Sequence, residues 1–240
     1  MSTTVCCLLY GDYPLLAERC LWPLSKLYKQ GIDIRLGCND ISKRTGDVIK
    51  SLFDPPNANL SLIIESPQIF KYPMMRRLFE VAPIKTKYVT WFDDDSYITD
   101  ACPVVWLNKL ESFMDSSGAD MAGSVYTMPV LPGQDQWRRL HCDWFTDRKR
   151  AHNYTKFATG GWWTLKTDVI RRYDWPHKSL KHRGGDVLLG ELLFQQDLNL
   201  IRYKDGVAIN ADANGKESAS KRRGYDEPPI GSRVKDGTSK

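Results

Sequence analysis

The chain has 240 residues, of which 42% are hydrophobic, 11% aromatic and 26% charged. This length and composition are typical of one globular enzyme or binding domain with a sizeable buried core. The apolar runs are too short for a transmembrane helix, and the stretch after Met1 lacks the basic region of a secretory signal. We therefore expect no membrane span and no signal peptide.

The charge is distributed unevenly along the chain. The net charge is +5, but residues 1–137 carry 13 Lys/Arg against 16 Asp/Glu, whereas residues 138–240 carry 21 against 13. The basic half indicates either a chance fluctuation with a basic tail or a surface that meets a polyanion. The six cysteines form no CxxC pair and no cluster with histidine, so we expect reduced thiols in a cytoplasmic protein without structural zinc. We also expect a monomer.

Strand and helix signals alternate through the first hundred residues. Apolar runs predict strands at 3–10, 32–38, 60–64 and 87–92, and helical periodicity predicts helices at 15–30, 43–53 and 74–82. Pro23 is expected to kink the first helix or to begin a second one. This order predicts an α/β fold with a mainly parallel, doubly wound sheet covered by helices.

The second half is less regular. We expect a helix at 103–115, a strand at 120–126, a turn and strand at 160–166, a helix at 186–196, and a hairpin formed by 200–203 and 207–210. Residues 128–158 show little periodicity. From Gly215 the composition shifts to Gly, Ser, Lys, Arg and Pro, which predicts a basic tail at 215–240 that is partly mobile when free.

Polar residues follow three of the predicted strands, at Gly11–Asp12, at Asn39–Asp40 and at the run Asp93–Asp95. Ligands of doubly wound sheets bind beyond the carboxyl ends of the strands, so the three stretches should converge on one crevice. Crowded carboxylates need a cation to neutralise them, and a hard divalent ion such as Mg²⁺ or Mn²⁺ prefers oxygen ligands. An acidic loop or helix cap is the alternative.

Two enzyme families place acidic residues in this way. The haloacid-dehalogenase-type phosphohydrolases end a strand in DxDx(T/V), and Asp93 and Asp95 fit that spacing. Tyr97, however, stands where that motif has Thr or Val, and no later strand with paired aspartates is evident. The other family is the GT-A glycosyltransferases, whose DxD motif holds the donor diphosphate through a metal.

Residues 3–212 resemble a GT-A glycosyltransferase in four segments, LLYGDYP (8–14), RLGCND (35–40), WFDDDS (91–96) and GGDVLLGELL (184–193). The resemblance implies one domain at 1–214, with a nucleotide-sugar-binding half at 1–100 and an acceptor-binding half at 101–214. It implies a UDP-sugar donor and Mn²⁺ or Mg²⁺. The donor-binding residues that it implies are Tyr10, Gly11, Asp12, Asn39, Lys71, Arg77, Asp93 and Asp94.

For the metal, the resemblance implies Asp95 as the principal ligand, with Asp93 beside it. A third ligand late in such chains is frequently His, but no histidine lies in the late segment here. Asn210 and Asp212 are available instead, and Asp212 is our choice. The basic run that includes Arg222 and Arg223 follows, and it would either close over the donor diphosphate or remain a solvated charged segment.

Asp186 is the predicted general base, because inverting GT-A enzymes often place an acidic loop before an apolar helix. Its carboxylate would take the proton of the acceptor hydroxyl as that oxygen attacks the anomeric carbon. Residue 185 is Gly where many relatives have an acid, so Asp186 stands alone, with Glu191 as the fallback. An aspartate that only caps the helix is the structural alternative.

On the acceptor side, GGWW at 160–163 combines close backbone approach at Gly161 with two indoles, Trp162 and Trp163, of which we expect Trp162 to be exposed and the other to be core. His141, Asp143 and Trp144 are further acceptor-side candidates. Residues 138–183 carry twelve Lys/Arg against four Asp, interleaved with aromatic residues. A nucleic acid would explain both the charge and the aromatic residues.

A narrower resemblance is to the phage and kinetoplastid glycosyltransferases of hydroxymethylated pyrimidines, including the base J glucosyltransferase. It is carried by KYPMMRRLFEVA, WFDDDSY, FATGGWW and INADANGKESASKRRG. It implies transfer from UDP-glucose or a related donor to 5-hydroxymethylcytosine or 5-hydroxymethyluracil in double-stranded DNA. The alternatives are a saccharide or small-molecule acceptor, a phosphohydrolase, and a non-catalytic nucleic-acid-binding module.

Overall fold

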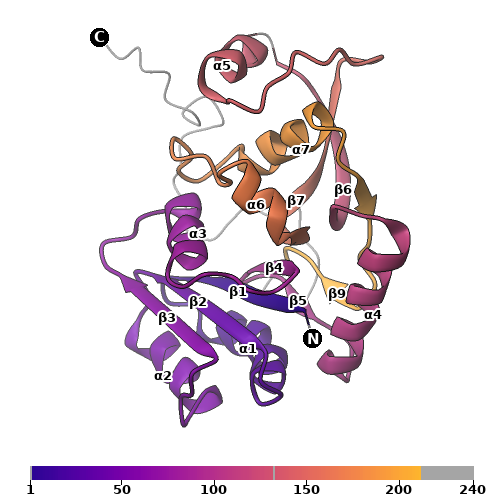
Figure 1. The fold of residues 1–240 in the computed structure, drawn as a ribbon. Helices are drawn as coiled ribbons and strands as arrows, with labels where there is room; N and C mark the ends of the chain where they lie inside the picture. Colours follow the sequence, from indigo (N-terminus) through magenta and orange to yellow (C-terminus); the bar gives the residue numbers. More distant parts are fainter. Residues whose placement is uncertain (1, 132, 212–240) are drawn as a thin grey trace.

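A computed structural model describes residues 2–131 and 133–211. One seven-stranded sheet organises the molecule, in the order β3-β2-β1-β4-β7-β6-β8, and a two-stranded sheet joins β5 to β9. Strands β1 to β4 are parallel to one another, whereas β7 is antiparallel to its neighbours β4 and β6, and β8 pairs in parallel with β6. The prediction of a mainly parallel sheet covered by helices is confirmed (Figure 1).

The first half alternates strands and helices as the sequence predicts. The strands are β1 (Thr3–Tyr10), β2 (Asp33–Asn39), β3 (Leu60–Glu65) and β4 (Tyr88–Asp93), and the helices are α1 (Pro14–Tyr28), α2 (Lys43–Leu52) and α3 (Lys71–Glu80). Strands β1 and β4 are buried along nearly their whole length, which explains their continuous apolar runs. Helix α1 continues through Pro23, so no second helix begins there.

In the second half, the elements are β5 (Tyr97–Ile98), α4 (Pro103–Ser117), β6 (Met121–Pro129), α5 (Gln134–His141), β7 (Tyr154–Lys166), α6 (Thr167–Arg172), α7 (Gly185–Gln195), β8 (Leu200–Arg202) and β9 (Val207–Ala208). The expected hairpin at 200–210 is wrong, because β8 pairs with β6 and β9 with β5. The irregular stretch 128–158 contains α5 and the start of β7, a 13-residue strand.

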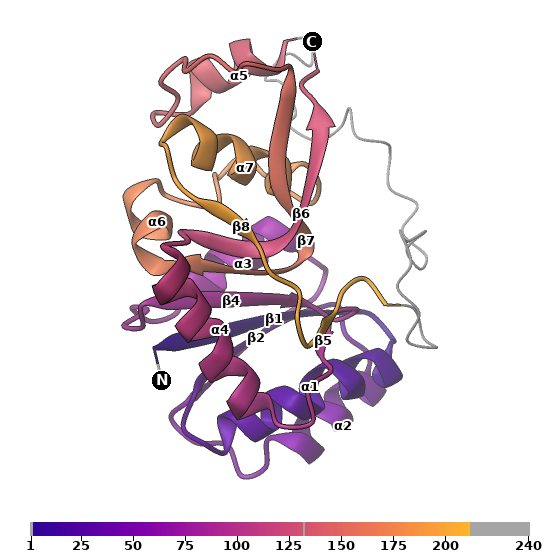
Figure 2. The same cartoon turned by 90° about the vertical axis from the view of Figure 1, so that its right-hand side faces the viewer.

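Helices cover both faces of the sheet (Figure 2). One core packs α1, α2 and α4 against the sheet, and the other packs α3, α6 and α7 against the opposite face. Helix α5 lies at the end of the molecule farthest from α1 and α2, beside the far ends of β6 and β7. None of the six cysteines forms a disulfide. Among the described helices, none is both long and apolar enough to cross a bilayer.

Candidate functional site

The turns that follow β1 and β2 are joined at the carboxyl edge of the sheet. The backbone N–H of Gly11 donates to the carbonyl of Asn39 (3.2 Å), and the Gly11 carbonyl accepts from the N–H of Ser42 (3.1 Å) and from Thr45 Oγ1 (3.1 Å). Gly11 has φ +54°, a left-handed conformation that favours glycine. Since β4 lies next to β1, the three predicted polar stretches do share one edge of the sheet.

Asn39 has a different role from the one predicted. Its side chain is fully buried, and it binds the backbone of the next segment: Nδ2 donates to the carbonyl of Phe70 (3.0 Å), and Oδ1 accepts from the N–H of Ile69 (3.2 Å). Phe70 itself has φ +68°, a strained conformation for a non-glycine residue. Asn39 therefore fixes the residues before α3 instead of presenting its amide to a nucleotide base.

Lys71 opens α3 and points into the site. Its side chain is nearly buried, and Nζ lies 2.6 Å from Asp93 Oδ2 and 2.6 Å from the carbonyl oxygen of Gly160. The other oxygen of Asp93 accepts from Nε1 of Trp91 (2.9 Å). The adjacent ammonium would repel a metal cation, which argues against Asp93 as a metal ligand, and the ion pair argues against Lys71 as a free phosphate-binding cation.

Asp94 and Asp95 are also buried, with exposed fractions of 6% and 1%. The hydroxyl of Ser96 lies 3.4 Å from Asp95 Oδ1, and the same hydroxyl accepts from the N–H of Asn210 (3.1 Å). The N–H of Ala211 donates to the Asp95 carbonyl (2.7 Å). The end of the described chain is therefore bound directly against the aspartate turn.

The residues around Asp95 supply oxygen donors suited to a hard divalent ion. Within residues 2–131 and 133–211, however, no three His, Cys, Asp or Glu side chains gather closely enough to hold a metal. A metal bound by Asp95 would therefore take its further ligands from other oxygen groups, such as those of the donor diphosphate. Asp212, Arg222 and Arg223 lie outside the described residues.

Gly160 and Gly161 are approached closely by side chains of the protein itself, whereas the sequence predicts that the acceptor approaches there. A β-carbon on Gly161 would lie 2.4 Å from Asn210 Oδ1 and 2.8 Å from Ser96 Oγ, so the strand packs directly against the aspartate turn. A β-carbon on Gly160 would lie 3.1 Å from Lys71 Nζ and 3.8 Å from Asp186 Oδ2. The lysine ammonium and the Asp186 carboxylate therefore face the same point on β7.

Asp186 lies in the first turn of α7, as predicted, and is half-buried. Burial raises the pKa of its carboxyl above the ordinary aspartate value, and the positive charge of Lys71 acts in the opposite direction. Its Oδ1 accepts from the N–H of Val187 (3.0 Å). The structure thus brings Asp186, Lys71 and Asp93 together from three different elements.

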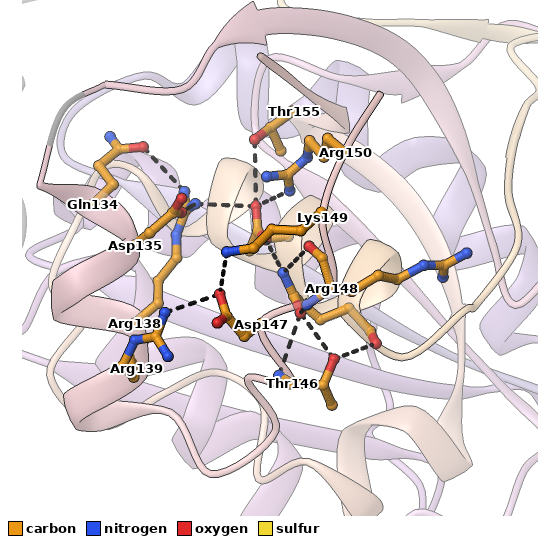
Figure 3. Close-up of polar contacts among 12 residues, drawn as sticks. Gln134, Asp135, Arg138, Arg139, Thr146, Asp147, Arg148, Lys149, Arg150 and Thr155 are labelled. Atoms are coloured by element: carbon orange, nitrogen blue, oxygen red, sulfur yellow. Dashed lines mark hydrogen bonds and ion pairs between the residues drawn. The ribbon is translucent and has the colours of Figure 1, made fainter. Parts of the chain in front are cut away.

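Glu191, the fallback base, is fully buried in an ion network that includes Arg138 and Arg150. Its Oε2 accepts from Arg138 Nη1 (3.0 Å) and from Arg150, and Oε1 accepts from Gln195 Nε2 (2.9 Å). Figure 3 shows how Arg138, Arg150 and Thr155 converge from α5, the following loop and β7. A carboxylate held by two guanidinium groups is a poor base, so its surroundings argue against this fallback.

The predicted aromatic acceptor surface is also wrong in part. Trp162 and Trp163 are 0% and 2% exposed, because β7 lies between β4 and β6 and both of its faces are covered. They do point to opposite faces: Trp163 stacks on Trp91, and Trp162 packs near Trp106. Trp144 is buried as well.

The other predicted residues lie near the edge of the sheet or on the surface. Arg77 forms an ion pair with Glu65 at the end of β3, so its guanidinium is already neutralised. Asp12 accepts from the Ser42 hydroxyl (2.5 Å), and the half-buried Tyr10 lies next to His182, with ring centroids 6.3 Å apart. His141 and Asp143 are exposed near α5.

Solved structures with a similar fold were found for most of the chain. The mannosyltransferase PcManGT from Pyrobaculum calidifontis, in complex with GDP-Man and Mn²⁺, matches with a TM-score of 0.55 and 14% identity over 85% of this chain. Residues 1–349 of S. aureus TarS match with a TM-score of 0.54 and 12% identity over 84%. The fold is that of the GT-A glycosyltransferases.

The match covers 55% of the PcManGT chain and 58% of the TarS chain, so this chain spans a little over half of the length of either structure. TarS was also solved with UDP-GlcNAc, and that structure matches with a TM-score of 0.51. No protein-family model matches the sequence, and no curated protein is similar to it.

Proposed function

We propose that this chain is a metal-dependent, inverting glycosyltransferase that uses a nucleotide-sugar donor. The observation that carries the proposal is that Asp186 lies beside Gly160 and that Ser96, the neighbour of Asp95, lies beside Gly161, at one edge of the sheet. Similar folds bind GDP-Man with Mn²⁺ in PcManGT and UDP-GlcNAc in TarS. The sequence resemblance favours a UDP-sugar, UDP-glucose or a related donor.

The roles of the residues follow from their surroundings. Asp186 has a raised pKa, and it is placed to remove the proton of an acceptor hydroxyl while that oxygen attacks the donor carbon. Lys71 neutralises Asp93. Asp95 would hold Mn²⁺ or Mg²⁺, which stabilises the negative charge of the departing nucleoside diphosphate.

Donor binding can be tested without knowing the acceptor. A thermal-shift panel of UDP, GDP and CDP should show stabilisation by one nucleotide only when Mn²⁺ is present, and EDTA should abolish it. Generic phosphate esters should not be hydrolysed. Turnover of such esters with Asp93 essential would support the phosphohydrolase alternative, although Asp93 is held by Lys71 and Trp91.

For the acceptor, we propose the hydroxymethyl group of 5-hydroxymethylcytosine or 5-hydroxymethyluracil in double-stranded DNA. The support is the narrower sequence resemblance, together with two exposed cations, Lys178 and Lys181, on the loop that leads to Asp186. Two exposed tyrosines, Tyr126 and Tyr154, remain for stacking after the tryptophans are assigned to the core.

The acceptor is tested by offering radiolabelled UDP-glucose to hydroxymethylated duplex DNA, unmodified DNA and a panel of free sugars. Label should appear only on the hydroxymethylated DNA. Label on a free sugar alone would refute the DNA acceptor and leave the donor chemistry standing. DNA binding without any nucleotide-sugar binding would instead support the non-catalytic alternative.

A further inference from the structure

The start of α3 is packed against the start of α7 through Tyr72. This side chain is 4% exposed, and its backbone N–H donates to the carbonyl of Lys181, on the loop before α7 (2.9 Å). An ideal β-carbon on Gly185 would lie 2.1 Å from Cζ and 2.4 Å from Oη of Tyr72. Real β-carbons essentially never make such short contacts, so residue 185 must be glycine while Tyr72 is in place.

The hydroxyl of Tyr72 meets the backbone at the first turn of α7. The N–H groups of Gly185 and Asp186 favour the ionised phenol, but burial and the charge of Asp186 outweigh them and raise the pKa of Tyr72 well above its usual value. The phenol therefore stays protonated, and its oxygen faces N–H groups that have no partner within the helix. Gly184, the N-cap residue, has no side chain to satisfy them.

The turn that carries Tyr72 is itself fixed. Asn39 binds the backbone of Ile69 and Phe70, and Lys71 is anchored to Asp93 and Gly160. Tyr72 is therefore held on the carboxyl edge of the sheet from both β2 and β4. Because Tyr72 is held in place and packs against Gly185, it restricts where the first turn of α7 can lie.

We propose that Tyr72 is a positioning residue, whose ring and hydroxyl fix the start of α7 so that the Asp186 carboxylate faces Lys71 and Gly160. This inference rests on the proposed function only in taking Asp186 as the base. It also explains why Asp186 has no acidic neighbour at 185, since the Tyr72 ring fills the space that such a side chain would need.

The first test is Tyr72→Phe, which keeps the ring and removes the hydroxyl. The rate constant kcat should fall on the order of 10²-fold, the loss expected for a displaced reacting group, while KM for the nucleotide sugar changes little. The pKa of Asp186, followed by ¹³C NMR of its carboxyl carbon, should fall toward the ordinary aspartate value, because a loosened helix start admits water.

Tyr28→Phe is the matched control. The Tyr28 hydroxyl is also buried and bonded, to the carbonyl of Pro55 (3.2 Å) and the N–H of Asn57 (2.5 Å), but it lies in the core on the α1 side of the sheet. This variant should lower Tm while keeping kcat and the Asp186 pKa. An unchanged Asp186 pKa in Tyr72→Phe, or an equal change in Tyr28→Phe, would overturn the proposal.

A second pair of variants tests the packing directly. Gly185→Ala should abolish transfer in the otherwise unchanged protein, and the same substitution in a Tyr72→Leu background should cause a much smaller further loss. Equal losses in both backgrounds would overturn the steric argument. If the protein transfers no sugar at all, the proposed function fails, and the NMR titration of Asp186 alone decides the role of Tyr72.

Discussion

Lys71 determines the electrostatics of the site at the scale of single residues. Its ammonium is paired with Asp93 in a nearly buried ion pair and faces Asp186 across Gly160. Removing one partner of a buried pair leaves an uncompensated charge, so Lys71 and Asp93 depend on each other. Among the residues that the structure describes, none forms an ion pair with Asp186, whose Oδ1 accepts from the N–H of Val187.

Asp186→Asn should lower the transfer rate by about two to four orders of magnitude, the range for loss of a general base, and leave donor binding intact. The base acts only when ionised, and burial raises its pKa. As the pH is lowered, the kcat/KM of the unmodified enzyme should therefore begin to fall at a higher pH than it would with an ordinary aspartate as the base.

Lys71→Met removes the charge that lowers the pKa of Asp186, so it should move this acid limb to still higher pH. A pH–rate profile of both proteins checks the direction, and Tm reports whether the variant folds. A limb that moves to lower pH would contradict the assignment.

A product that retains the anomeric configuration by NMR would exclude a single inverting displacement.

Asp95→Asn should weaken binding of the donor nucleotide mainly when metal is present, because the lost carboxylate is the proposed metal ligand. Asp168→Asn is the control, since Asp168 is an exposed residue of α6. Helix α6 follows β7, which runs antiparallel to β4, so it begins at the edge of the sheet opposite Asp95. Titration calorimetry with and without Mn²⁺ measures the difference. If nucleotide affinity in Asp95→Asn keeps its full response to metal, Asp95 is not the ligand.

At the scale of elements, strands that are buried on both faces have continuous apolar sequences, and β1, β2 and β4 can therefore be predicted from the sequence. The features that the sequence does not reveal, helix α5 and the pairing of the strand predicted at 200–203, depend on distant partners. Helix α5 is fixed by Arg138 binding Glu191, 53 positions away, and β8 pairs with β6 across a separation of nearly eighty residues. Local periodicity does not contain such contacts.

The same limit applies to the site. The aspartate run and Gly160–Gly161 can be recognised in the sequence. Three adjacent carboxylates directly after a strand are unusual, and so are paired glycines within a strand. That Lys71 neutralises Asp93, or that Asn39 fixes the backbone before α3, depends on which strands become neighbours. Trp162 was misjudged because the sequence does not show that β7 is a central strand.

The buried network around Glu191 joins α5 and its following loop to α7. Glu191→Gln would leave Arg138 and Arg150 without their buried charge partner, and it should lower the free energy of unfolding by about 3–5 kcal/mol. Asp135→Asn removes a half-exposed partner of the same Arg138 and should cost about 1 kcal/mol or less.

Urea denaturation followed by circular dichroism measures both variants, and nucleotide binding should persist in both under folding conditions. If Glu191→Gln were no less stable than Asp135→Asn, a structural role of Glu191 would be refuted. Loss of transfer in a fully folded Glu191→Gln variant would restore it as a candidate base.

At the scale of the whole molecule, several of the cations in residues 138–240 are paired internally. Arg139 and Lys149 pair with Asp147, Arg148 pairs with Asp197, and Lys166 pairs with Asp120. The number of Lys and Arg residues in a segment therefore overstates the cationic surface that it offers to a polyanion. The cations that can bind DNA phosphates are those that lie near the site and are not paired with a carboxylate.

Lys178 and Lys181 meet this condition. Both are exposed on the loop before α7, and within the described part of the chain no carboxylate pairs with either. If each contacts one phosphate, replacing both with Ser should reduce the slope of log K against log salt for duplex DNA by about 2, since each contact contributes about 0.9. The matched control replaces Lys29 and Lys50, which are also exposed but lie at the ends of α1 and α2.

Those helices run back across the sheet after β1 and β2, so their last turns lie at the edge opposite the site. Fluorescence anisotropy with a labelled duplex, from 50 to 200 mM salt, measures all three proteins. The control pair should keep the slope of the unmodified protein. Equal slopes in both double variants would show that DNA does not approach the loop before Asp186, and the acceptor would then have to be sought among uncharged hydroxyl compounds.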